Sequence, residues 1–157
     1  GHVEVVRALL EDGRADPAAD HSTALRMAAR NGHTEIVSLL LRDLRADPAA
    51  GDNYAVQWAA GYGRTEVVRI LLKDARVDAS AGNNRGVAWA ARNDHEETVR
   101  LLLQDPRVDG TRAIEVAKPN VVMVLIENER CGIEVNRELF EEHHPLAVKK
   151  CDQMSVE

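Results

Sequence analysis

The feature that most constrains this chain is an internal sequence repeat with a step of 31 residues. The hexapeptide that begins at Gly1 returns at Gly32 and at Gly63, and a weaker copy begins at Asp94. Other markers keep the same step: alanine pairs begin at Ala28, Ala59 and Ala90, and aspartates stand at Asp16, Asp47, Asp78 and Asp109. A fixed period of this size is typical of a stacked repeat array rather than of a compact globule.

Each repeat unit predicts two short helices joined by a tight turn. The first helix covers about residues 24–31 and is rich in alanine, so that it can lie close to a neighbouring backbone. The second covers about residues 34–42, where apolar residues such as Ile36 and Leu40 recur at helical spacing. Gly32 lies between them, where a reversal favours a residue that tolerates positive φ. Because helices shorter than about 12 residues gain their stability from packing, we expect an all-α solenoid of stacked antiparallel helix pairs.

Composition narrows the class of protein. The 157 residues correspond to about one domain. The 45% of apolar residues can form a core, and 3% of aromatic residues make that core one of Leu, Val, Ile and Ala. A net charge of −6 argues against non-specific nucleic-acid binding, and no apolar run is long enough for membrane insertion. Two cysteines are too few for a disulfide scaffold, so we expect an intracellular protein, cytoplasmic or nuclear.

The pattern within a unit resembles the ankyrin repeat. It is Ala-Ala-x-x-Gly-His-x-Glu-Val-Val-x-Leu-Leu-Leu, read best over residues 28–41, with an Ala-Asp or Val-Asp step before each turn. The resemblance covers residues 1–126. It implies L-shaped units whose helix pairs stack, with loop tips and the open face of the first helices lining a concave groove that contacts protein partners.

Two departures from the family pattern affect the loops. The family period is about 33 residues, whereas this chain has 31. The family tetrapeptide Thr-Pro-Leu-His is replaced in successive units by Thr23-Ala24-Leu25-Arg26, Tyr54-Ala55-Val56-Gln57 and Arg85-Gly86-Val87-Ala88. The side-chain hydrogen bonds by which that tetrapeptide ties loop to loop are therefore lost, and we expect β-hairpin fingers to be poorly formed or absent.

The two ends of the array are irregular. The first unit lacks its first helix, which leaves Val5 and Leu9 without a packing partner on one side. We expect this chain to be monomeric or part of a longer array, the alternative being a dimer that covers the bare face. The closing unit, about 111–126, is degenerate: Thr111 is the expected N-cap of a first helix and Pro119 begins a second. Residues 127–157 are expected to form a capping segment and a charged tail.

Catalysis and metal binding have little support. No nucleophile motif such as Gly-x-Ser-x-Gly and no phosphate-binding glycine loop occurs, so we expect no enzyme and no cofactor. His2, His33 and His95 occupy equivalent positions on separate units, about 8–10 Å apart, which is too far to share one zinc ion. We expect each to bond local backbone. A zinc alternative is formed by Cys131, His143, His144 and Cys151, but no pair has the tight spacing of a zinc site.

Two further columns of the repeat each allow two interpretations. Trp58 and Trp89 share the position of Met27, and they either pack between repeats, which we favour, or anchor a partner. The step Asp-x-Arg-x-Asp recurs four times, beginning at Asp12 in the first unit. Stacking makes it a ladder of alternating charge. Its arginines either bridge carboxylates of their own and adjacent loops, which we favour, or form a track for an acidic peptide.

Positions that differ between units on the predicted open face are the candidate binding residues. They are Arg26, Arg30, Asn53, Tyr54, Gln57, Tyr62, Asn84, Arg85 and Arg92. We expect a non-catalytic scaffold that binds a protein partner through loop tips and the concave face. One alternative is a structural spacer within a longer repeat protein. Another is an anion or lipid-headgroup surface formed by the four arginines of this set.

Overall fold

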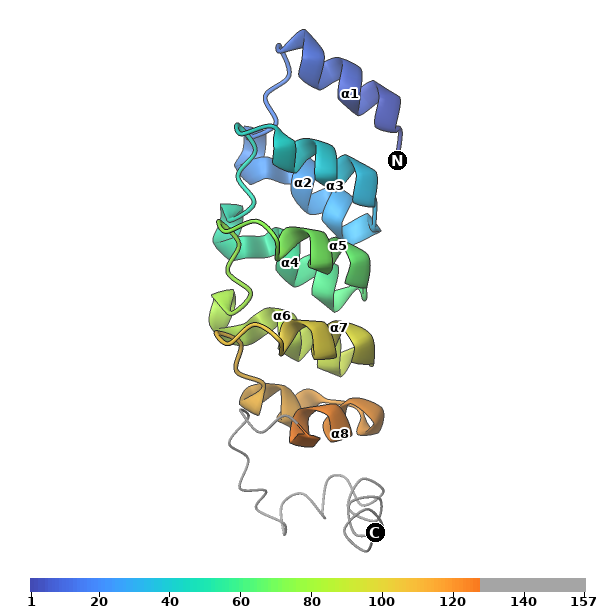
Figure 1. The fold of residues 1–157 in the computed structure, drawn as a ribbon, viewed down its shortest axis with the longest axis vertical. Helices are drawn as coiled ribbons and strands as arrows, with labels where there is room; N and C mark the ends of the chain where they lie inside the picture. The colour runs from blue at the N-terminus through green and yellow to red at the C-terminus, as the bar shows by residue number, and fades with distance from the viewer. Residues whose placement is uncertain (128–157) are drawn as a thin grey trace, which may run out of the picture.

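The computed structural model describes residues 1–127, which form an elongated stack of helix pairs (Figure 1). The elements are α1 (Val3–Asp12), α2 (Ala19–Asn31), α3 (Thr34–Arg42), α4 (Ala50–Gly61), α5 (Thr65–Leu71), α6 (Ala81–Arg92), α7 (Glu96–Leu102), the 3-10 helix η1 (Thr111–Val116) and α8 (Pro119–Glu127). No strand occurs within residues 1–127. The predicted all-α solenoid without hairpin fingers is therefore confirmed.

The helices form two parallel rows. Helices α2, α4, α6 and η1 pack on one another in one row, and α1, α3, α5, α7 and α8 do so in the other. In Figure 1, α3, α5 and α7 lie in front of their partners. Residues 31 positions apart therefore lie over one another along the stack. The predicted capping segment and tail lie outside the described residues.

The core is one continuous apolar column between the two rows. Val37 and Leu40 from α3 are buried, and their equivalents Val68 and Leu71 in α5 are buried as well. The alanine pairs of the first helices are also buried, which lets those helices approach closely. Helix α3 has the predicted bounds because its apolar spacing of 3.6 residues per turn continues from end to end.

The first helices begin earlier than predicted. Helix α2 starts at Ala19 rather than near residue 24, because Asp20, His21 and Ser22 form a turn with φ of 50–54°. Equivalent left-handed turns, at residues 51–53 and 82–84, consist of Gly, Asp and Asn. These residue types tolerate left-handed backbone best. The right-handed part of α2 begins one residue before the predicted start.

The last residue of each left-handed turn ties its loop to the next one. Its side-chain oxygen accepts a hydrogen bond from the backbone N–H of an aspartate 25 positions later. The pairs are Ser22 with Asp47 at 2.9 Å, Asn53 with Asp78 at 2.8 Å, and Asn84 with Asp109 at 2.9 Å. The family's loop-to-loop bonds, predicted to be lost, are thus replaced by a different side chain.

The turn between paired helices uses left-handed backbone as predicted. Gly32 has φ 81° and Gly63 has φ 63°. In the next unit Asp94 takes the same position with φ 66°.

The closing unit differs in part from its prediction. Its first helix is a 3-10 helix, and Thr111 is not an N-cap, so that prediction is wrong. The physical reason is that Asp109 Oδ1 accepts hydrogen bonds from both the backbone N–H and the hydroxyl of Thr111. Pro119 begins α8 as predicted, since the first position of a helix needs no donor.

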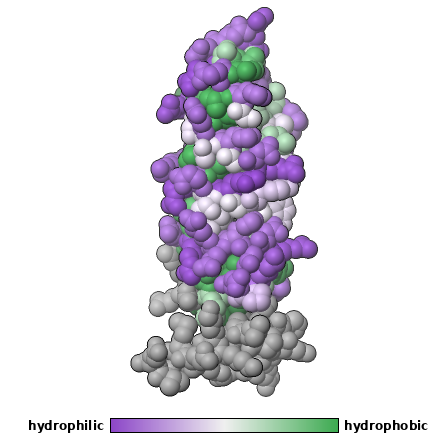
Figure 2. Space-filling model, turned by 90° about the vertical axis from the view of Figure 1, so that its right-hand side faces the viewer, coloured by the Kyte–Doolittle hydropathy of each residue, from purple (hydrophilic) through white to green (hydrophobic). Residues whose placement is uncertain are grey.

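Helix α1 is the least buried helix of the array. It contains no buried residue. Val5 is 57% exposed and Leu9 is 49% exposed, in agreement with the bare side predicted from the sequence. Figure 2 shows apolar surface at the end of the molecule that α1 occupies and mostly hydrophilic surface further along that side.

Candidate functional site

The candidate site is the open side of α2, α4 and α6, which we call the first-helix face. We define it by the eight arginine and aromatic side chains that are exposed or half-buried on these three helices or, for Tyr62, at the C-cap of α4. They are Arg26, Arg30, Tyr54, Trp58, Tyr62, Arg85, Trp89 and Arg92. Because the three helices pack side by side, these residues share one surface that spans three repeat units.

An arginine–aromatic cluster joins α2 to α4. The Arg30 guanidinium carbon lies 4.8 Å from the ring centre of Tyr62 and 5.7 Å from that of Trp58. Arg26 lies 5.9 Å from the Trp58 ring centre. Tyr54 stacks on Trp58 with ring centres 6.0 Å apart. The three arginine–ring distances are within the range of cation–π attraction, which is about 6 Å.

A second arginine–aromatic contact lies on α6. The Arg85 guanidinium carbon is 5.8 Å from the ring centre of Trp89. Trp89 also packs on the preceding unit, since a Cβ placed on Gly61 would lie 3.2 Å from it. Trp58 and Trp89 are half-buried. Trp89 therefore packs between repeats, as favoured from the sequence for this column, whereas Met27 at the equivalent position is 39% exposed. The outer sides of both tryptophans belong to the first-helix face.

Three candidate residues direct their polar groups into the helix stack and its loops rather than outward. Gln57 is 0% exposed and Asn53 is 8% exposed. The Gln57 side-chain amide donates to the Asp52 carbonyl. Asn53 and Asn84 accept the loop-to-loop bonds described above. The structure therefore assigns Asn53 and Gln57 to the interior, and Asn84, half-buried, to the same bonding.

Arginines outside the first-helix face are paired with carboxylates in most cases. In the second-helix row, Arg7, Arg69 and Arg100 contact glutamates of their own helix at 3.1–3.6 Å. In the loops, Arg14, Arg45, Arg76 and Arg107 contact aspartates at 2.6–2.7 Å. These pairs neutralise part of the positive charge of the other row and of the loop edge, whereas Arg42, Arg64 and Lys73 form no ion pair within residues 1–127.

Arginines of the first-helix face differ in this respect. Arg30, Arg85 and Arg92 form no ion pair with any carboxylate of residues 1–127. Arg26 has one such contact, a long one of 4.0 Å to Asp20. The Arg85 side chain donates to Gln57 Oε1 at 3.5 Å. Three arginines without a matching carboxylate among residues 1–127 therefore lie on this face, in a chain whose net charge is −6.

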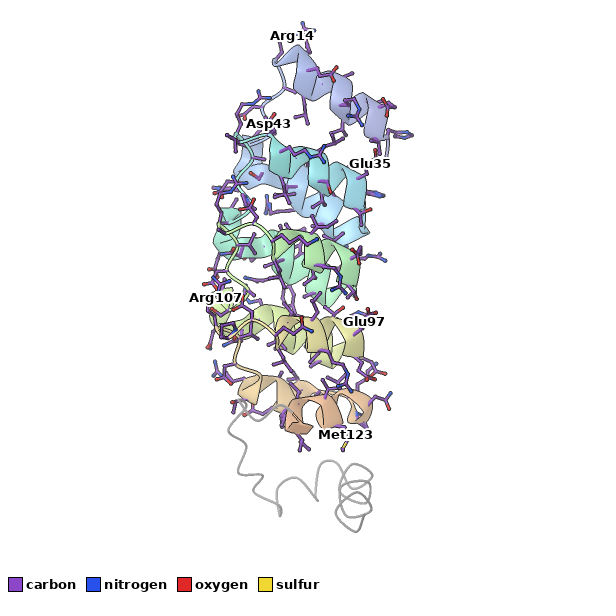
Figure 3. The ribbon with its side chains drawn as sticks, in the orientation of Figure 1. Arg14, Glu35, Asp43, Glu97, Arg107 and Met123 are labelled. Carbon is purple, nitrogen blue, oxygen red and sulfur yellow. The ribbon has the colours of Figure 1, made fainter. Side chains whose placement is uncertain are left out.

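The ladder of Asp-x-Arg-x-Asp steps runs along one edge of the stack. Figure 3 shows Arg14, Asp43 and Arg107 along that edge and Glu35 and Glu97 along the opposite one. The hydrogen bond from the Arg45 side chain holds the pKa of Asp43 below its usual value, and Arg76 acts in the same way on the pKa of Asp74.

The ladder arginines also reach the preceding loop. Arg45 donates to the Ala15 carbonyl at 3.2 Å, and Arg76 donates to the Ala46 carbonyl at 3.0 Å. Arg107 lies 3.8 Å from the carboxylate of Asp78. The favoured structural interpretation is therefore correct for a residue's own loop, whereas the adjacent loop is reached mainly through backbone carbonyls.

The histidines that occupy equivalent positions in different units also have a structural role. A Cβ on Gly1 would lie 2.9 Å from the His33 ring, and one on Gly63 would lie 2.6 Å from His95. The His33 and His95 imidazoles thus pack against the glycine of the preceding unit, whereas bonding to local backbone was predicted for them. No group of three or more potential metal ligands occurs within residues 1–127. The zinc alternative at Cys131, His143, His144 and Cys151 lies outside the described residues.

Comparison with known proteins agrees with this architecture. A family model described as ankyrin repeats, in three copies, matches residues 1–52 and 48–114. No curated protein matches the chain. Within the part of the chain that the structure describes, no helix is both long and apolar enough to span a bilayer. The period, the stacked helix pairs and the family match together show that the chain belongs to the ankyrin repeat family.

Proposed function

We propose that this chain is a non-catalytic module that binds a protein partner through the first-helix face. Ankyrin repeats generally serve as protein–protein interaction modules and are typically non-catalytic. The observation that carries the proposal is the gathering of Tyr54, Trp58, Tyr62 and Trp89 with arginines that lack carboxylate partners among residues 1–127. Tyrosine, tryptophan and arginine are the residue types that dominate interface energies.

The frame beneath this face supports the proposal. Side-chain bonds such as Asn53 to Asp78 fix each loop to the next. The aromatic side chains are held between helices, as Trp89 is against Gly61. A surface that is already ordered loses little conformational entropy on binding, which favours affinity for a given contact area. The small number of cysteines favours an intracellular site of action.

The binding residues that we propose are those of the first-helix face. From the candidates chosen on sequence variation they retain Arg26, Arg30, Tyr54, Tyr62, Arg85 and Arg92. Asn53, Gln57 and Asn84 are left out because their polar groups bond within the frame. Trp58 and Trp89 are added for their half-buried rings.

Site-specific photo-crosslinking tests this proposal. A benzoylphenylalanine replaces Tyr62, which is 47% exposed on the first-helix face, and a matched variant carries it at Leu44, which is 85% exposed on the loop edge. In an extract of the cells that make the protein, we expect one discrete adduct from position 62 and none of the same mass from position 44. Equal labelling from both positions, or none from either, would instead favour the spacer function.

A further inference from the structure

We propose that the first-helix face binds an extended acidic segment of its protein partner, with carboxylates on both sides of a short apolar stretch. This inference rests on the proposed function and names the chemistry of the partner. It follows from three observations: where the unpaired charge lies, how the guanidinium groups are held, and how far apart they stand.

Arginines without a carboxylate partner within residues 1–127 recur on the first-helix face, where a ligand can reach them. Arg7, Arg69 and Arg100 in the second-helix row have glutamate partners, whereas Arg30 and Arg92 have no carboxylate partner within residues 1–127. Arg30 is half-buried and Arg92 is exposed. A ligand that supplies carboxylates here would complete the pairing that the chain itself supplies elsewhere.

Aromatic rings lie within cation–π distance of the guanidinium groups on this face. Arg30 lies against the rings of Trp58 and Tyr62, and Arg85 lies against Trp89. Contact through the flat side of a guanidinium leaves its N–H edge available, and that edge matches a carboxylate in bidentate fashion. A partly desolvated pair on such a platform is stronger than one in open water.

The spacing of the arginines sets the length of the ligand. Arg26 and Arg30 belong to α2, Arg85 and Arg92 belong to α6, and α4 between them carries aromatic residues but no arginine. Two helix-to-helix steps of about 8–10 Å separate the pairs by about 16–20 Å. A polyproline-type segment rises about 3.1 Å per residue, so its acidic groups would stand about six residues apart. Apolar residues between them would lie over Tyr54, Trp58 and Tyr62.

Membranes and nucleic acids fit these observations less well. A chain of net charge −6 is repelled by an extended anionic surface beyond the local contact. Nucleic-acid backbones place charge every few ångströms and call for a continuous basic stripe, whereas α4 interrupts the arginines with an aromatic strip. An acidic peptide with an apolar centre matches both the separation of the arginine pairs and the aromatic residues between them.

Fluorescence anisotropy on the full chain tests the inference. The probe is a fluorescein-labelled peptide, Glu-Glu-Pro-Pro-Leu-Pro-Glu-Glu, and its control has glutamine in place of every glutamate. We expect the control to bind at least about tenfold more weakly, and the acidic peptide to lose about tenfold in affinity as salt is raised to about 0.5 M.

Charge-reversal variants locate the binding. Arg30 and Arg92 occupy equivalent positions two units apart, and the double change Arg30→Glu with Arg92→Glu should abolish binding of the acidic peptide. The matched control is Arg42→Glu with Lys73→Glu, also equivalent positions but at or just after the C-terminal ends of the second helices, with the same change of net charge. We expect it to bind within about twofold of the natural chain, because exposed charges farther than about 10 Å are screened. Thermal unfolding monitors the fold of both variants, and Arg30→Gln with Arg92→Gln replaces the reversal if it fails to fold.

Three results would overturn the inference. They are equal binding of the glutamine peptide, equal loss in the two double variants, and tighter binding of phosphatidylserine-containing vesicles or oligothymidylate than of the acidic peptide. Loss of peptide binding with a persisting crosslink from position 62 leaves the protein-binding function in place and removes only the acidic chemistry. Absence of both would remove the proposed function as well.

Discussion

At the scale of single residues, two asparagines in left-handed turns serve the array twice. Asn53 has φ 62° and Asn84 has φ 62°, values that few residues other than Gly, Asn and Asp adopt at low cost. The side chain of each also accepts the backbone N–H of the following loop. The same amide thus stabilises its own turn position and the seam between two units.

Replacing Asn53 tests this double role. We expect Asn53→Ala to lower the free energy of unfolding by about 2–3 kcal/mol, because the Asp78 N–H loses its acceptor and alanine is strained at positive φ. Urea unfolding measures the change. Asn31→Ala, an exposed position at the end of α2, is the control and should change stability by less than about 0.5 kcal/mol. An equally small effect at Asn53 would contradict the role assigned to it.

The buried leucines give a second residue-scale prediction. Leu40 is 2% exposed and Leu71 is 0% exposed, so either change to alanine should cost about 2–5 kcal/mol. Leu44→Ala removes the same atoms from a side chain that is 85% exposed and should cost little. Chemical denaturation of the three variants provides the comparison. If both core changes cost less than about 0.5 kcal/mol, the buried column is misidentified.

At the scale of elements, the loops are held by side-chain hydrogen bonds and the helices by apolar packing. The pKa of Asp43, of Asp74 and of Asp109 is lower in the folded chain than the ordinary value of 3.8, owing first to side-chain hydrogen bonds from Arg45, Arg76 and Thr111. A carboxyl whose pKa is lowered by folding stabilises the native state above its ordinary pKa. That contribution is lost as pH falls below 3.8 and through the folded-state pKa.

The loops should therefore respond to acid. We expect the melting temperature to fall as pH is lowered from about 4 towards 2, and Asp74→Asn to reduce the size of that fall. Circular dichroism melts across this range measure both. Glu11→Gln, which neutralises an exposed carboxylate on α1, is the control and should leave the acid dependence unchanged. An identical dependence in Asp74→Asn would show that the Asp74–Arg76 pair contributes nothing.

The helices and the turns differ in how well the sequence predicts them. The second helices were predictable because apolar spacing marks them directly, and α3 ends at Arg42 as expected. The left-handed turns were not, because Gly, Asp and Asn indicate a turn without specifying three consecutive positive φ angles. At the candidate site, variation between units suggested exposure for Gln57, yet that side chain turns inward to bond the Asp52 carbonyl. The carboxylate pairing of the loop arginines was predictable from the repeated Asp-x-Arg-x-Asp step, whereas the contacts of Arg26 and Arg30 with Trp58 depend on how neighbouring helices pack.

At the scale of the whole molecule, each unit contacts only its neighbours. The free energy of unfolding is then close to the sum of contributions from each unit and from each interface between units. Local unfolding is therefore expected to begin where these interfaces are weakest. Helix α1 has no buried residue, whereas α4 is packed between α2 and α6 and buries Val56, Ala59 and Ala60.

Hydrogen exchange should show this gradient. We expect backbone amides of α1 to exchange fastest among the helices of residues 1–127 and those of α4 slowest, because local opening precedes global unfolding. Mass spectrometry of peptic fragments resolves the two regions. Leu40→Ala, which weakens the unit next to α1, should speed exchange in α1 and α3 more than in α7. Uniform exchange along the array would mean that it unfolds as one cooperative block.

The left-handed turns also make the interfaces between repeat units interchangeable. Ser22, Asn53 and Asn84 each present one acceptor to the same backbone position of the unit that follows. Removing residues 48–78, one full period, would bring α2 against α6, with Arg30 facing Trp89 where it now faces Trp58. Such an excision shortens the rod without creating a mismatched joint. Gene rearrangements could therefore add or remove whole repeats. The first-helix face would then become longer or shorter while its chemical character stays the same.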